Sequence, residues 1–182
     1  FVNRVWAHYF GIGLVHPVDD FSLANPPSND KLLGALAKRF VESGYDIRDL
    51  ERTVLLSRTY QLSSTPNATN KLDKNNYARA YIRPMMAEVV VDVLNDAMGT
   101  KERWGVGEGH ENARAIEVGA SRVSNQNVNY VFRVFGRPPR TTACDCERAA
   151  DPALPQKLFL LADSNLVLKL RTANNRVATV LK

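Results

Sequence analysis

The two cysteines of the chain lie one residue apart, in the stretch RTTACDCERAADPALPQ at residues 140–156. The thiolates of Cys144 and Cys146 can both touch one soft metal ion, but a closed zinc site needs about four ligands. The three histidines of the sequence, His8, His16 and His110, have no companion spacing that completes such a set. The signal for zinc is therefore weak, and we assign no metal ligands in this chain.

A disulfide between Cys144 and Cys146 would close a small, strained ring of the reducible kind. Arg140 and Arg148 favour the thiolate form of the sulfurs, whereas Asp145 and Glu147 oppose it. Three interpretations stay open: two small buried residues in a packed turn, which we favour, an oxidised pair in an exported protein, and a metal site. The candidate interaction or redox site consists of Arg137, Arg140, Cys144, Cys146, Glu147 and Arg148.

Three carboxylates follow one another at helical spacing. Glu88, Asp92 and Asp96 stand at i, i+4 and i+8, which places them on one helix face. Like charges there cost roughly 0.2–0.5 kcal/mol per pair, so we expect compensation. The arginines that we expect to cross this face are Arg83, Arg133, Arg137 or Arg140. A calcium or magnesium site is the alternative, disfavoured because helix-borne carboxylates lack a ligand loop, and a solvated face is the common outcome.

Asp19 and Asp20 lie in a proline-flanked loop and complete the candidate acidic site with the three carboxylates above. Adjacent aspartates can act as general acid and base or as metal ligands, but in loops they more often form turns and cap helices. The sequence contains neither a Gly-x-Ser-x-Gly nucleophile elbow nor a phosphate-binding glycine loop. No catalytic residue is therefore assigned.

Hydrophobic periodicity predicts a mainly α protein with five or six helices in an irregular bundle. The expected helices occupy residues 2–10, 29–44, 47–62 and 85–99, with two more after Asp151 and Ser164. A long loop is expected around 100–120, and a short strand is an alternative to a buried helix near 128–135. We expect one helical domain over residues 1–182, and since the chain opens directly on a helix, a fragment of a longer multidomain protein.

Residue types at the helix ends suggest where each helix begins and which side chains it buries. Ser28, Asp46, Asp151 and Ser164 are expected N-caps, and Gly11 or Gly13, Gly44 and Gly99 are expected stops. The helix after Pro84 is expected to bury Met86, Val89, Val90, Val93 and Ala97. Leu154, Leu158 and Leu161 share a face of the next-to-last helix, and the final helix is expected to bury Leu166, Leu170, Ala173, Val177 and Val180.

Charge divides the chain into a neutral and a basic half. Residues 1–100 hold eleven basic and eleven acidic side chains, whereas residues 101–182 hold thirteen and eight, which accounts for the net charge of +5. An arginine-rich surface suits carboxylates or phosphates, although intramolecular pairing is the more common explanation. Nucleic acid as a partner rests on charge alone and is disfavoured. No apolar run approaches the roughly 20 residues of a transmembrane helix.

Three blocks of the sequence together resemble a known family. They are VNRVWAHYFGIG with the loop through Asp19, Asp20 and Phe21; Arg83-Pro84 with Ala87, Glu88 and Asp92; and FGRPPRTTACDCERAADPALPQ. This pattern is similar to a domain of unknown function of planctomycete-type bacteria, placed at the C-terminal end of large exported proteins beside cytochrome-c-like domains. The matching residues are Asn3, Arg4, Trp6, Phe10, Gly11, Gly13, Asp19, Asp20, Phe21, Pro27, Tyr60, Gln61, Arg137, Pro138, Cys144, Cys146, Glu147, Arg148, Pro155 and Gln156.

The resemblance implies a helical domain in an exported setting, periplasmic or at the cell surface. It implies haem c elsewhere in the parent protein and no cofactor in this chain. We expect a non-catalytic accessory domain that contacts other domains of the parent, an envelope protein or a polysaccharide. The alternative is an enzyme: a thiol-redox module built on Cys144 and Cys146, or a hydrolase acting on polysaccharide through Asp19, Asp20 or Glu147.

Overall fold

The computed structural model describes most of the chain. The described residues are 1–105, 110, 112–119, 123–137, 154–172 and 175–180. They form two compact units, Phe1–Arg83 (unit 1) and Pro84–Lys182 (unit 2). Each unit has a hydrophobic core of its own.

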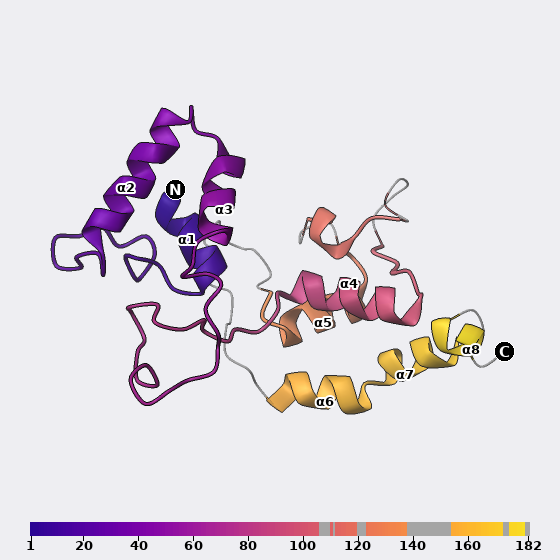
Figure 1. Cartoon of the computed structure of the whole chain (residues 1–182). Coiled ribbons are helices and arrows are strands. Elements are labelled where there is room, and N and C mark those ends of the chain that lie inside the picture. Colours follow the sequence, from indigo (N-terminus) through magenta and orange to yellow (C-terminus); the bar gives the residue numbers. More distant parts are fainter. Residues whose placement is uncertain (106–109, 111, 120–122, 138–153, 173–174, 181–182) are drawn as a thin grey trace. The chain divides into compact units, whose positions relative to one another are not determined.

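Unit 1 contains three helices that pack pairwise against one another. These are α1 (Val2–Phe10), α2 (Asp30–Glu42) and α3 (Ile47–Leu55), drawn in indigo to violet in Figure 1. As predicted, α1 ends at Gly11, whose φ of 81° lies in the left-handed region that favours glycine. The remainder of unit 1 is loop that covers these helices.

Two helix ends of unit 1 differ from the prediction. Asn29, not Ser28, caps α2, because its side chain accepts from Leu32 N at 3.0 Å while Ser28 N donates to the Leu14 carbonyl at 2.7 Å. Asp46 caps α3 as predicted. This helix stops at Leu55 and not near residue 62, since the Ser57 hydroxyl donates to the carbonyl of its last turn.

Aromatic rings hold the core of unit 1 together. Trp6 stacks on Phe10 with 4.0 Å between ring centroids, and Tyr77 meets both rings edge-on. The Tyr77 hydroxyl donates to the Gly13 carbonyl at 2.8 Å, which ties the loop before Arg83 to the end of α1. The buried residues of this core are Val2, Trp6, Phe10, Leu14, Leu36, Leu50, Val54 and Tyr77.

Unit 2 is organised around one helix. Its elements are α4 (Ala87–Met98), the 3₁₀ helix η1 (Ala115–Glu117), α5 (Gln126–Val134), α6 (Leu154–Ala162), α7 (Ser164–Arg171) and α8 (Arg176–Val180). Helix α4 contacts α5, η1 and α8, while α6 packs on α5 and on α7 (Figure 1). The core residues are Ala87, Val91, Trp104, Ala115, Val118, Val123, Val128 and Phe132.

The segment considered for a strand near 128–135 is helical. Asn125 caps α5 by accepting hydrogen bonds from the backbone N–H groups of the first turn. Val128 and Phe132, four residues apart, both lie in the core, which a helix allows. In the loop expected around 100–120, the only helical turn among the described residues is η1.

The buried face of α4 differs from the apolar stripe predicted from the sequence. Val90 is buried as predicted, but Val89 and Val93 are 37% and 46% exposed and Ala97 is exposed. Glu88, Asp92 and Asn95 are buried instead. Arginines that reach these carboxylates make this inward orientation tolerable, because a buried charge must be paired.

The C-terminal helices also bury fewer leucines than expected. On α6, Leu154, Leu158 and Leu161 are exposed, and Phe159 is the buried residue. Asp163, not Ser164, caps α7, and Leu170 and Val180 are exposed. Ala173 and Asp151 lie outside the described residues, as does the side chain of Val177.

The described secondary structure is mainly helical, as predicted, with more helices than the five or six expected. None of the helices in the described ranges is both long and apolar enough to cross a membrane.

Asn3 offers a test of how unit 1 holds its first loop. This buried side chain donates to the carbonyls of Val15 and Val18 at 2.9 and 2.8 Å and accepts from Val15 N at 3.0 Å. Asn3→Ala leaves buried backbone groups unsatisfied, so we expect about 1–3 kcal/mol lower unfolding free energy in urea titrations. The control Asn25→Ala removes one bond at the loop surface and should cost clearly less; equal losses would contradict the role of Asn3.

Candidate functional site

Glu88 is the most buried carboxylate of α4. Its Oε1 lies 3.1 Å from Nε of Arg137, and the two side chains are only 3% and 5% exposed. Arg137 also donates to the Val118 carbonyl at 2.9 Å and lies 4.2 Å from the ring centroid of Phe132. Two charges removed from water are tolerated only with such additional partners. The pair therefore connects α4, the residue after η1 and the end of α5.

The prediction that arginines cross the acidic face is confirmed for Arg137. Arg83 instead donates to the backbone carbonyl of His8 in unit 1, and Arg133 is exposed. Arg140 lies outside the described residues. The burial of Arg137 gives it a packing role in unit 2.

Asp92 and Asp96, one turn apart on α4, share one arginine that was not among those predicted. Arg114 Nε lies 3.5 Å from Asp92 Oδ2, and its Nη2 lies 3.1 Å from Asp96 Oδ2. Asp92 further accepts from the backbone N–H of Ala115 at 2.8 Å. The side chain of Asp92 is 10% exposed and that of Asp96 is 70% exposed. Asp92 and Asp96 are the second and third carboxylates of the acidic ladder of α4, which consists of Glu88, Asp92 and Asp96. They thus hold the η1 segment against α4.

A third cation reaches α4, from the C-terminal part of the chain. Lys169 on α7 donates to Asn95 Oδ1 at 2.9 Å and forms an ion pair with Glu102. Asn95 also accepts from the Thr100 hydroxyl. No sequence pattern joins these residues, because Lys169 follows Asn95 by 74 positions.

Part of this charged cluster lines a polar cleft of about 180 Å³ in unit 2. Its walls include Asp92, Asp96 and Glu102 with Arg114, and the indole of Trp104 lies beside them. Each of these carboxylates already accepts from a cation or a backbone N–H. Within the described parts of the chain, no three His, Cys, Asp or Glu side chains lie close enough together to hold a metal ion.

Asp19 and Asp20 lie in unit 1, where both organise a loop. Asp19 receives two hydrogen bonds from Arg4 of α1, at 2.8 and 3.0 Å. These bonds lower the pKa of the Asp19 carboxyl. Asp20 accepts from Ser22 N at 3.2 Å, which is the turn-forming role common for aspartate. In these hydrogen bonds, Asp19 and Asp20 have different partners.

The cysteine pair lies outside the described residues, together with Arg140, Glu147 and Arg148. Of the candidate interaction or redox site, Arg137 alone is within the described ranges. The three interpretations of Cys144 and Cys146 therefore stay predictions.

Asp92 and Asp96 provide a matched pair for testing the acidic ladder, because both bind Arg114 but differ in burial. Asp92→Asn replaces a buried charged acceptor, and we expect a loss of about 1–3 kcal/mol of unfolding free energy. Asp96→Asn removes an exposed ion pair and should cost less than about 1 kcal/mol. Chemical denaturation of both variants gives the comparison, and a larger loss for Asp96→Asn would refute this ranking.

The buried pair can be tested by removing one partner and then both. Arg137→Met leaves the Glu88 carboxylate without its cation, so we expect about 3–5 kcal/mol less protection of unit 2. Adding Glu88→Leu should recover most of the lost protection. Amide hydrogen exchange of α4 and α5 reports on unit 2 by itself. Arg133→Met, on the exposed side of α5, is the control; a double variant as unstable as Arg137→Met would contradict the assignment.

One protein-family profile matches nearly the entire chain. The profile of one family, PSD1, described as "Protein of unknown function (DUF1553)", matches residues 1–181. None of the curated proteins and none of the solved structures matches the chain. On the strength of the family match, the chain belongs to the PSD1 (DUF1553) family of proteins of unknown function.

Proposed function

We propose that this chain is a non-catalytic interaction domain of a large, exported, cytochrome-c-associated bacterial protein. The family membership covers the whole described structure, and the resemblance stated above supports the exported parent. The observation that carries the binding role is the exposed apolar surface of α6 and α7.

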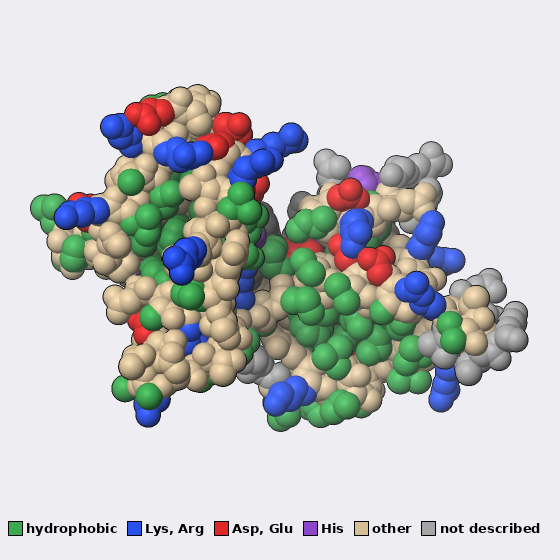
Figure 2. All heavy atoms as spheres, viewed as in Figure 1, with side chains coloured by type: hydrophobic (Ala, Val, Ile, Leu, Met, Phe, Trp, Pro, Cys, Tyr) green, Lys and Arg blue, Asp and Glu red, His purple; other side chains and the backbone are tan. Residues whose placement is uncertain are grey.

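Helix α6 leaves most of its leucines in solvent. Leu158 and Leu161 are 54% and 80% exposed, and Leu154 and Leu160 are exposed as well, while only Phe159 is buried. Leu168 and Leu170 on α7 are exposed as well. Figure 2 shows hydrophobic side chains gathered on the face of unit 2 that contains α4 and α6. Single exposed leucines are ordinary, but several on one short helix are typical of a protein-binding surface.

The charges next to this surface indicate what the partner carries. Lys157, Arg171 and Arg176 are exposed on α6, α7 and α8. The carboxylate of Asp163 is used in capping α7. An apolar surface with a basic edge is complemented by an apolar surface with acidic residues around it. We assign that partner surface to the upstream domains of the parent protein.

The test is a titration of the 182-residue chain with the separately produced upstream region of its parent, followed by calorimetry. Wild-type chain should bind, and the binding should weaken as salt rises from about 0.05 to 0.5 M. Leu158→Ser/Leu161→Ser removes exposed apolar area without opening the core. We expect at least about tenfold weaker binding for this variant, the size of effect that central apolar contacts have.

The control is Leu23→Ser/Leu72→Ser, which changes two leucines that are exposed in the loops of unit 1. This variant should bind as wild type does. Equal binding by the α6 variant, or no binding by wild type, would refute the proposed surface. A dimer in analytical ultracentrifugation that dissociates in the α6 variant would make a second copy the partner. Turnover of a sulfated glycan by the purified chain would refute the non-catalytic role.

A further inference from the structure

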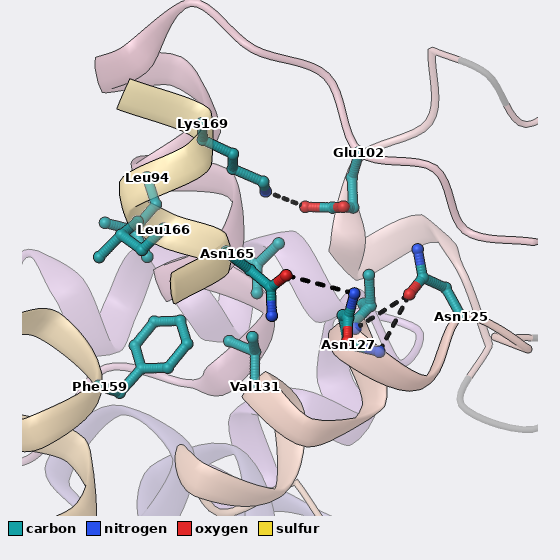
Figure 3. A pocket seen from close by; sticks show the side chains of 11 residues that line it. Leu94, Glu102, Asn125, Asn127, Val131, Phe159, Asn165, Leu166 and Lys169 are labelled. Carbon is teal, nitrogen blue, oxygen red and sulfur yellow. Dashed lines mark hydrogen bonds and ion pairs between the residues drawn. The ribbon is translucent and has the colours of Figure 1, made fainter. Parts of the chain in front are cut away.

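A second cavity in unit 2 is distinct from the polar cleft in its chemistry. It has a volume of about 210 Å³, is partly open to solvent, and is lined by residues of α4, α5, α6 and α7. Side chains from all four helices line it (Figure 3). Its apolar walls are Val91, Leu94, Val128, Val131, Phe159 and Leu166.

The volume limits the size of a ligand. An apolar protein cavity of about 150 Å³ accommodates a benzene molecule. Sites for drug-sized molecules begin at about 300 Å³. A cavity of about 210 Å³ therefore suits one six-membered ring with one or two small substituents.

The charged groups at the cavity favour a neutral ligand. Lys169 and Glu102 both line it and neutralise one another in an ion pair, with side chains 27% and 13% exposed. An added anion would meet the Glu102 carboxylate, and an added cation would meet the Lys169 ammonium group. Because Lys169 also donates to Asn95, two of its three N–H groups are already used within unit 2.

Two amides supply the polar contact. Asn127 from the first turn of α5 and Asn165 from the first turn of α7 point toward one another (Figure 3). Asn127 Nδ2 donates to Asn165 Oδ1 at 3.4 Å, which is longer than the usual 2.7–3.2 Å of an N–H···O bond. A hydroxyl group both donates and accepts, so one hydroxyl can accept from Asn127 and donate to Asn165 in place of this long bond. The third amide, Asn125, is used in capping α5 and in binding the Arg103 carbonyl.

We propose that this cavity binds a neutral aromatic ring that carries one hydroxyl group, the chemistry of a phenol or of a tyrosine side chain. The ring lies among the apolar side chains and the hydroxyl group contacts Asn127 and Asn165. This site does not depend on the interaction surface of α6, whose leucines Leu158 and Leu161 are not among the residues that line the cavity.

The first experiment compares three probes on the full chain by ¹H–¹⁵N NMR: p-cresol, toluene and benzoate. We expect p-cresol to shift the amide resonances of α5 and α7 saturably. Toluene, which lacks the hydroxyl group, should bind about threefold to tenfold more weakly, the factor that one net hydrogen bond supplies. Benzoate should not saturate, because its carboxylate meets Glu102. Binding of benzoate as tight as that of p-cresol, or no saturable shift with p-cresol, would overturn the site.

Two variants locate the binding. Asn165→Leu should leave toluene binding in place and abolish the preference for p-cresol, a result that general destabilisation would not produce. Val131→Phe fills the cavity and should weaken p-cresol at least about tenfold. Leu168→Phe, an exposed position on α7, is its matched control. Unchanged p-cresol affinity in folded Val131→Phe, or an unchanged preference in Asn165→Leu, would refute the proposal.

A last titration with N-acetyl-tyrosine amide distinguishes the two sources of the ring. Affinity within about threefold of p-cresol assigns the cavity to a tyrosine side chain of a protein. Binding of p-cresol without binding of the capped tyrosine assigns it to a free phenolic molecule. Since these probes are small molecules, failure here leaves the test with the upstream domains unaffected.

Discussion

The ion pair between Glu88 and Arg137 sets the arrangement of unit 2. Burying two charges costs several kcal/mol each unless they are paired and further hydrogen-bonded. The Val118 carbonyl and the Phe132 ring complete the environment of the guanidinium. Consequently the start of α4, the chain after η1 and the end of α5 must meet at one point. The core of Ala87, Trp104, Val128 and Phe132 forms around that point.

Other polar residues along α4 are also paired with cations from distant segments of the chain. Arg114 compensates Asp92 and Asp96, and Lys169 compensates Glu102 while it binds Asn95. Every cation comes from a different segment, so charge pairing recruits η1 and α7 to α4. Because the polar side of α4 is used in this way, its valines Val89 and Val93 face solvent. The ion pairs on the buried face of α4 and the exposed valines on its other face both follow from the orientation of this helix.

Local signals in the sequence predicted several local features, although Asn29 and Asp163 cap their helices in place of the neighbouring Ser28 and Ser164. Gly11 and Gly99 end helices in the left-handed conformation, and Asp46 caps α3, because each of these effects acts within one turn. The orientation of α4 could not be predicted in the same way. It depends on Arg114 and Arg137, which stand 22 and 45 positions beyond Asp92 in the sequence. The i, i+4, i+8 spacing of the carboxylates correctly indicated that cationic side chains pair with this face of α4, and Arg137 was among the arginines expected to do so. Arg114 lies in a stretch without periodicity, so no pattern pointed to it.

The two tryptophans of the chain are divided between the two cores. Trp6 packs on Phe10 in unit 1, and Trp104 stacks on Phe132 in unit 2, and both indoles are 3% exposed. Intrinsic fluorescence is therefore the sum of two local signals, one from each unit. A chain with one core open and the other intact has an emission spectrum intermediate between the native and the unfolded spectra. Where the two cores open separately, stability is two quantities, and the less stable unit determines how often the chain is exposed to proteolysis.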